Sequence, residues 1–116
     1  MKIIRSFGFA WNGIRNCFVT QLNFRIHILG SVLAVLTGFG LQISSTEWLF
    51  VVFCIAMVSV TEMINTGMEK LCDLTETGFH PAIRIIKDIA AGAVLVSAIA
   101  SLCAGIMIFL PKILGH

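Results

Sequence analysis

Charged side chains are scarce along this chain, and their scarcity argues against a soluble fold. Only 12% of the 116 residues are charged, whereas 58% are hydrophobic, and the mean hydropathy is +0.98. A small soluble domain exposes a large share of its surface and needs polar residues to cover it. We therefore expect most of this chain to lie in lipid.

Cysteine-based metal motifs, long basic runs and internal repeats are also missing. The four cysteines stand far apart and form no CxxC pair, so their spacing predicts no Cys/His metal site. A net charge of +2 is too small to indicate nucleic-acid binding. The arginine-bearing N-terminal stretch lacks the clean apolar core of a signal peptide. With no linker-like segment, residues 1–116 are predicted to form one membrane domain.

Uncharged runs are what the chain has in abundance, and they cover residues 28–46, 48–61 and 89–110. A helix needs about 20 apolar residues to cross a bilayer. The first and third runs are long enough, whereas the second crosses only if it continues past Glu62. We therefore predict an all-α integral membrane protein with transmembrane helices over residues 28–46, 48–70 and 86–110.

Capping and breaking residues set the expected ends of these helices. Ser45 or Thr46 is expected to cap the second transmembrane helix. Pro81 suits the first turn of the third helix, and Pro111 is expected to end that helix at Leu110.

Residues 1–27 predict an amphipathic helix that lies in the membrane interface, because apolar side chains recur every three or four residues on one face. These apolar positions are Ile4, Phe7, Trp11, Ile14, Phe18 and Leu22. Seven of the eight Lys and Arg residues fall on one side of the membrane if the N-terminus and the 70–88 connection are cytoplasmic. The positive-inside rule therefore predicts a cytoplasmic N-terminus.

The stretch TEMINTGMEKLCD at residues 61–73 places carboxylates at the end of an apolar run. At 1.5 Å per residue, Glu62 lies about 21 Å from Trp48 along a helix, within a hydrocarbon layer about 30 Å thick. Glu69 and Asp73 fall within about 20° of Glu62 around the same helix. An intramembrane carboxylate is costly, and it therefore marks a candidate functional site.

This stripe suits phosphoryl transfer to a hydroxyl group in the membrane. A carboxylate inside the bilayer could take the proton of the hydroxyl, and one nearer the water could hold Mg²⁺ against phosphate oxygens. Lys87, beside Asp88, could supply positive charge to the transferring group. The alternatives are a structural polar contact at Glu62 and a simple interfacial anchor at Lys87.

Several motifs resemble the small prokaryotic diacylglycerol kinase/undecaprenol kinase family. They are FRIH at 24–27, ExxNTxxExxxD at 62–73, His80-Pro81, KDIAAGAVL at 87–95 and IFLPK at 108–112. The resemblance covers nearly the whole chain, and the AAGAVL and IFLP wording is closer to the undecaprenol kinase branch. It implies a homotrimer in the bacterial inner membrane that uses MgATP to phosphorylate undecaprenol or diacylglycerol, in active sites shared between neighbouring chains.

The resemblance also implies roles for individual residues. Glu62 matches the catalytic base, Glu69 and Gln21 the metal site, and Asn65 and Asp73 supporting positions. The implied ATP-binding residues are Lys2, Phe9, Gln21, Glu69, Gly78, Phe79, His80, Lys87 and Asp88. The implied lipid-binding residues are Arg15, Asn23, Phe24, Arg25, His27, Glu62 and Ala91.

Gln21 departs from the family pattern, which usually has a metal-binding glutamate at this position. A glutamine carbonyl can ligate Mg²⁺ but carries no charge, and residues 1–46 contain no acid to replace it. Four explanations stay open: an introduced inactivating change, a natural weak-metal variant, recruitment of Asp73 or another acid, and lost activity.

Three functions therefore compete for this chain. The first is a lipid kinase, in which the choice between undecaprenol and diacylglycerol stays open. The second is a catalytically weakened or inactive pseudokinase or lipid-binding protein, which Gln21 motivates. The third is a proton or cation pathway along the Glu62 stripe.

Overall fold

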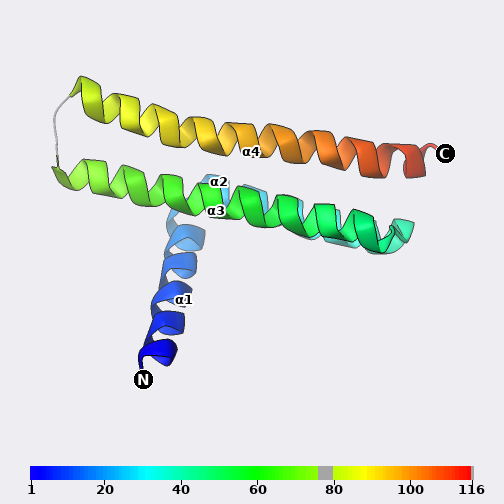
Figure 1. The fold of residues 1–116 in the computed structure, drawn as a ribbon, viewed down its shortest axis with the longest axis horizontal. Coiled ribbons are helices and arrows are strands. Elements are labelled where there is room, and N and C mark those ends of the chain that lie inside the picture. The colour runs from blue at the N-terminus through cyan, green and yellow to red at the C-terminus, as the bar shows by residue number, and fades with distance from the viewer. Residues whose placement is uncertain (76–79, 116) are drawn as a thin grey trace.

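The computed structural model describes residues 1–75 and 80–115, and it is helical almost throughout these ranges. The helices are α1 (Lys2–Thr20), α2 (Leu22–Leu41), α3 (Ser45–Thr75) and α4 (Pro81–Ile113). By length and composition, α2, α3 and α4 could each cross a membrane. Helix α1 runs crosswise to them (Figure 1). These features confirm the expected fold class, an N-terminal amphipathic helix followed by three candidate spans.

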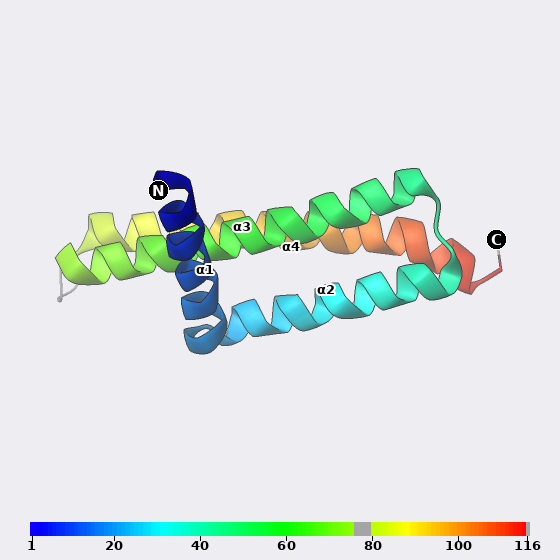
Figure 2. The same cartoon turned by 90° about the horizontal axis from the view of Figure 1, so that it is seen from below.

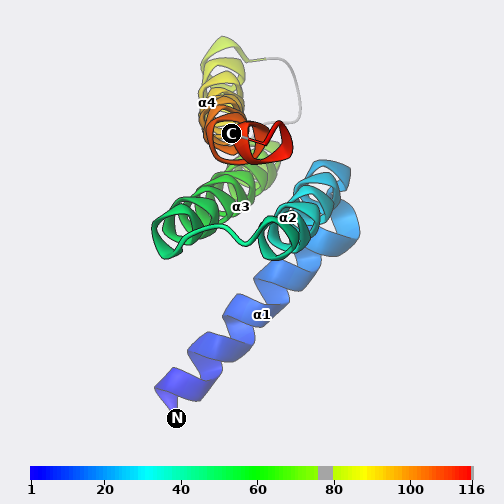
Figure 3. The same cartoon turned by 90° about the vertical axis from the view of Figure 1, so that its right-hand side faces the viewer.

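The three long helices pack with α3 in the middle (Figure 3). Helix α4 runs antiparallel to α3 along most of its length, and α2 runs beside the first part of α3 (Figures 1 and 2). Helix α2 has 20 residues, which makes it about 30 Å long, the thickness of the hydrocarbon layer. Helices α3 and α4 have 31 and 33 residues. Their joined end therefore extends past the level of α1 (Figure 1).

The break between α1 and α2 lies at Gln21, which corrects the expected boundary after residue 27. Gln21 has an extended backbone with φ −113° and ψ 110°. The guanidinium Nη1 of Arg25 donates to the carbonyls of Phe18 and Val19, at 2.9 Å each. These bonds satisfy carbonyls that the end of α1 leaves without helical partners. The sequence does not indicate this break, because the apolar spacing continues past Gln21 and no glycine or proline lies there.

Helix α3 begins earlier than expected because Ser44, rather than Ser45 or Thr46, is its cap. The backbone N–H of Glu47 donates to Ser44 Oγ at 3.2 Å, and the backbone N–H of Ser44 donates to Glu47 Oε1 at 2.9 Å. This reciprocal pair is a capping box. The backbone hydrogen bond from Ser44 lowers the pKa of Glu47, which precedes the apolar run of α3.

Helix α4 begins at Pro81, as expected, but runs past Pro111 to Ile113. His80 caps its start, since Nδ1 of His80 accepts from the backbone N–H of Ala82 at 3.2 Å. Pro111 removes only one backbone donor so close to the helix end, and the N–H of Leu114 still reaches the carbonyl of Leu110 at 3.0 Å. In the last turn, Lys112 Nζ lies 3.2 Å from Glu47 Oε1 and ties α4 to the start of α3.

Gly38 leaves room for the indole of Trp48 where α2 and α3 meet. A Cβ at position 38 would lie 2.8 Å from Cη2 of Trp48 and 3.1 Å from Cδ1 of Ile43, both inside normal carbon–carbon contact. We expect Gly38→Ala to displace Trp48 and to lower the free energy of unfolding by about 1–3 kcal/mol. Thermal unfolding and the emission of Trp48, read in a Trp11→Phe background, measure both effects.

Gly40→Ala is the matched control, because a Cβ at position 40 meets nothing within 4 Å. Alanine is the better helix former by about 1 kcal/mol, so this variant should be as stable as the parent or slightly more stable. Equal losses of stability in the two variants would contradict the contact between Gly38 and Trp48.

Candidate functional site

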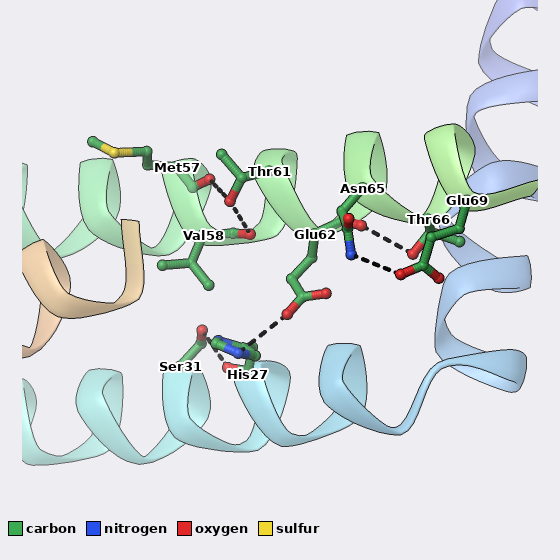
Figure 4. A network of polar contacts seen from close by, with 9 residues as sticks. All are labelled: His27, Ser31, Met57, Val58, Thr61, Glu62, Asn65, Thr66 and Glu69. Carbon is green, nitrogen blue, oxygen red and sulfur yellow. Dashed lines mark hydrogen bonds and ion pairs between the residues drawn. The ribbon is translucent and has the colours of Figure 1, made fainter. Parts of the chain in front are cut away.

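Glu62 is a buried carboxylate in the middle of α3, and its side chain is only 5% exposed. Its carboxylate points across to α2, where Oε1 lies 3.3 Å from Nε2 of His27 (Figure 4). An ionisable side chain is costly to bury without a partner. The contact with His27 supplies such a partner and joins the two helices.

Glu62 is buried because it lies on the packed face of α3. Val51, Val58 and Thr66 are also buried, and their spacings of seven and four residues from one another and from Glu62 place them on that face. Thr66 Oγ1 donates to the carbonyl of Glu62 at 2.9 Å, within the helix. The helix therefore holds the Glu62 carboxylate toward α2 rather than toward lipid.

Exposure increases along the acidic stripe toward the joined end of α3 and α4. Glu62 is buried, Glu69 is half-buried and Asp73 is exposed. The stripe therefore leads from the packed interior to the part of α3 that extends past α1 (Figure 1).

Asn65 and Glu69 form a second polar pair, one to two turns beyond Glu62 (Figure 4). Asn65 Nδ2 donates to Glu69 Oε1 at 3.3 Å. Asn65 Oδ1 is buried and accepts no hydrogen bond from the described residues. A buried oxygen of this kind needs a partner, and amide and carboxylate oxygens are the ligands that Mg²⁺ prefers. The chemistry of this pair therefore fits a hard cation.

The metal ligands that the resemblance implies are not assembled within one chain. No group of three or more His, Cys, Asp or Glu side chains suited to a metal occurs in residues 1–75 and 80–115. Gln21 lies at the junction of α1 and α2, and its Nε2 donates to Thr20 Oγ1 at 3.3 Å. The structure thus brings Asn65 and Glu69 together, and it records no contact between Gln21 and Glu69 in the described part of the chain.

Lys87 joins the start of α4 to the stripe on α3. Its Nζ lies 2.8 Å from Asp73 Oδ1, with 39% of the lysine side chain and 67% of the aspartate side chain exposed. Ion pairs this exposed contribute little to stability, because solvent screens the two charges. A phosphate group could therefore take the place of Asp73 at little cost.

The other implied residues are dispersed over three helices. Lys2, Phe9 and Arg15 lie exposed on α1, Asn23 lies exposed on α2, and Asp88 and Ala91 lie exposed on α4. Gly78 and Phe79 fall outside the described residues.

Three implied residues belong to the joint between α1 and α2 or to the start of α4. Phe24 is buried in protein contacts, with 3% of its surface exposed. Arg25 binds the last carbonyls of α1, and His80 caps α4. These contacts give all three a structural role besides any role in binding.

The contact of His27 with Glu62 is the feature that sequence reasoning missed. A signal for it exists, because His27 directly precedes the uncharged run at residues 28–46 and Glu62 directly follows the one at residues 48–61. A histidine at that depth is a natural partner for a buried acid.

An apolar groove of about 660 Å³ lies between α2, α3 and α4. His27 and Ile26 line one end of it, and Phe109 and Ile113 line the other. These two ends correspond to the start of α2 and the end of α4, so the groove follows the long axis of the bundle. Its size and lining suit a hydrocarbon chain.

The sequence of this chain is similar to a known family and to several named proteins. The family described as prokaryotic diacylglycerol kinase matches residues 8–109. The undecaprenol kinase of Bacillus subtilis (strain 168) is 35% identical over 112 residues, which cover 97% of this chain and 91% of that protein. The diacylglycerol kinase of Synechocystis sp. is 35% identical over 98% of this chain and 66% of its own length. The diacylglycerol kinase of Escherichia coli (strain K12) is 24% identical over 84% of this chain and 80% of its own length.

Proposed function

Because the chain belongs to the prokaryotic diacylglycerol kinase family, we propose that it is a membrane lipid kinase that transfers the γ-phosphoryl group of MgATP to undecaprenol or diacylglycerol. One observation carries the proposal: a buried carboxylate, Glu62, stands beside the end of an apolar groove. From Glu62, polar side chains continue along α3 toward water. A lipid hydroxyl and a soluble nucleotide could therefore meet along one helix face.

The groove and Glu62 serve the lipid in this proposal. The hydrocarbon chain lies in the groove, and the hydroxyl is held at the His27 end. Glu62 accepts the hydroxyl proton as the oxygen attacks the γ-phosphorus and ADP leaves. Arg15, Asn23, Phe24, Arg25 and Ala91 are proposed to bind the rest of the lipid.

Glu69, Asn65 and Gln21 are the residues that would hold Mg²⁺. When bound, the ion neutralises charge on the phosphate oxygens. The free Oδ1 of Asn65 supports this assignment, because the oxygen is buried next to a carboxylate and accepts no hydrogen bond from the described residues. Gln21 would complete the set through its amide oxygen.

Lys87 is proposed to exchange Asp73 for a phosphate oxygen when the nucleotide binds. The short, exposed contact between the two side chains supports this exchange. The further residues proposed for ATP are Lys2, Phe9, Gly78, Phe79, His80 and Asp88, with Gln21 and Glu69 beside the metal.

The proposed setting is a homotrimer in the bacterial inner membrane, with a cytoplasmic N-terminus. The charge asymmetry supports the orientation. Large apolar side chains are exposed on every helix, which supports cover by lipid and by neighbouring chains. Those neighbours could supply the ligands that one chain does not assemble.

A pseudokinase is the second candidate function, and Gln21 is the observation that favours it. The position that usually carries a metal-binding carboxylate is uncharged here. A protein of this kind would bind nucleotide and lipid without phosphoryl transfer.

We expect the purified protein in mixed micelles to transfer labelled γ-phosphate from ATP to a lipid hydroxyl in a Mg²⁺-dependent reaction. Undecaprenol and diacylglycerol are compared side by side, and the ratio of the two rates identifies the preferred lipid. Nucleotide binding without transfer to either lipid would favour the pseudokinase. Ion flux in liposomes without ATP would instead indicate an ion pathway.

A further inference from the structure

His27 contacts the proposed catalytic base, but the transfer step described above gives it no role. It contacts the Glu62 carboxylate at 3.3 Å, and it lines the end of the apolar groove. We propose that His27 removes the transferred proton from Glu62 and releases it to water, and so restores the base after each turnover. This inference rests on the proposed function. It gives His27 the role of a proton relay, which the phosphoryl transfer reaction alone does not require.

Burial explains why Glu62 needs such a partner. The Glu62 side chain is 5% exposed, whereas the His27 side chain is 28% exposed. A proton taken from the lipid hydroxyl therefore arrives on a carboxyl group with little direct access to water. His27 is the side chain that contacts this carboxyl group in the described part of the chain, and it is the more exposed of the two.

Among the residues that the structure describes, the surroundings of His27 hold no equally suitable proton acceptor. On α2, Arg25 turns toward the carbonyls of α1. On α3, the next acid is Glu69, which accepts from Asn65. The groove-lining residues of α4 are all uncharged and non-titrating.

The two remaining neighbours of the site do not change this conclusion. Lys87 of α4 is paired with Asp73 at 2.8 Å. The titratable side chains of helix α1 are basic, apart from the buried Cys17. Histidine is also the side chain that ordinarily gains and loses a proton between about pH 5 and 8.

The proton balance of the step is simple. The O–H bond of the lipid breaks and its proton goes to Glu62, while a bond forms between the lipid oxygen and the γ-phosphorus. The bond between that phosphorus and the bridging oxygen breaks, and ADP leaves with the electron pair. The proton then passes from Glu62 to Nε2 of a neutral His27 that carries its own proton on Nδ1, and the imidazolium releases one proton to water. One proton leaves the site for each phosphate transferred.

The test compares the wild-type chain with His27→Gln, which keeps a hydrogen-bonding side chain but cannot carry a proton. We expect kcat of the wild type to rise with pH, because only the neutral imidazole can accept a proton from Glu62. In His27→Gln, kcat should fall by about 100-fold, at the low end of what proton-transfer groups contribute. The rise with pH should disappear, and the loss should lie in kcat rather than in KM for ATP, since Glu62 is retained.

Two further variants separate proton transfer from a structural role. Free imidazole should restore activity to His27→Ala by accepting the proton from Glu62. Ser31→Ala removes the hydroxyl that donates to the His27 carbonyl at 2.8 Å, and it should retain the wild-type dependence on pH. The inference is overturned if His27→Gln keeps the wild-type kcat and pH profile, or if imidazole does not restore His27→Ala. A wild-type chain that transfers no phosphate would instead overturn the proposed function, and this inference with it.

Discussion

Glu62→Gln should reduce lipid phosphorylation by about 10²- to 10⁴-fold, the usual contribution of a general base. Glutamine has nearly the same size and can still hydrogen-bond with His27, so the packing between α2 and α3 should be retained. It cannot take the hydroxyl proton. The loss should therefore lie in kcat, with nucleotide binding unchanged. Labelled phosphate transfer and a separate nucleotide-binding titration measure the two quantities.

Glu47→Gln is the matched control for this prediction. Glu47 lies at the opposite end of α3, where it caps the helix and pairs with Lys112. Its loss should lower stability slightly and leave transfer activity intact. If Glu62→Gln were as active as Glu47→Gln, Glu62 could not be the base.

Gln21→Glu should lower the Mg²⁺ concentration required for half-maximal activity by about tenfold, because hard cations bind carboxylates more tightly than amides. The variant places a negative charge where residues 1–46 otherwise have none. Binding of Mn²⁺, followed by electron paramagnetic resonance in the absence of lipid, gives a readout that does not depend on turnover. Both measurements should shift in the same direction.

Gln42→Glu makes the same chemical change at the far end of α2, where Gln42 is exposed. It should leave the affinity for both metals unchanged. If the Mg²⁺ titration of Gln21→Glu matched that of Gln42→Glu, position 21 would not be a ligand in this chain. Tighter Mn²⁺ binding in Gln21→Glu alone would establish that Gln21 occupies the metal site.

The helical class and the spans could be predicted because they depend on composition and on local patterns. Long uncharged runs need to cross about 30 Å of lipid, and that length alone placed Glu62 inside the apolar layer. The order of exposure from Glu62 to Asp73 follows from helix geometry in the same way. These features need no knowledge of which helices touch.

The features that the sequence did not reveal depend on contacts between helices. The break at Gln21 is closed by Arg25, whose hydrogen bonds reach back to α1. The cap of α3 at Ser44 is an exception, because the reciprocal bonds between Ser44 and Glu47 are local and their spacing in the sequence could have indicated them. The contact between Glu62 and His27 depends on the register of α2 against α3, and the periodicity of the sequence does not give this register.

The continuity of α3 has a consequence for how this protein tolerates insertions and deletions. Glu62 and Glu69 lie on one uninterrupted helix, Ser45–Thr75, so helical rise alone fixes their separation along the axis at about 10 Å. One inserted residue between them would turn everything beyond it by about 100°. Glu69 would leave the face that carries Glu62, although every side chain would still be present. The number of residues between Glu62 and Glu69 is therefore as important for the site as the identity of the two side chains.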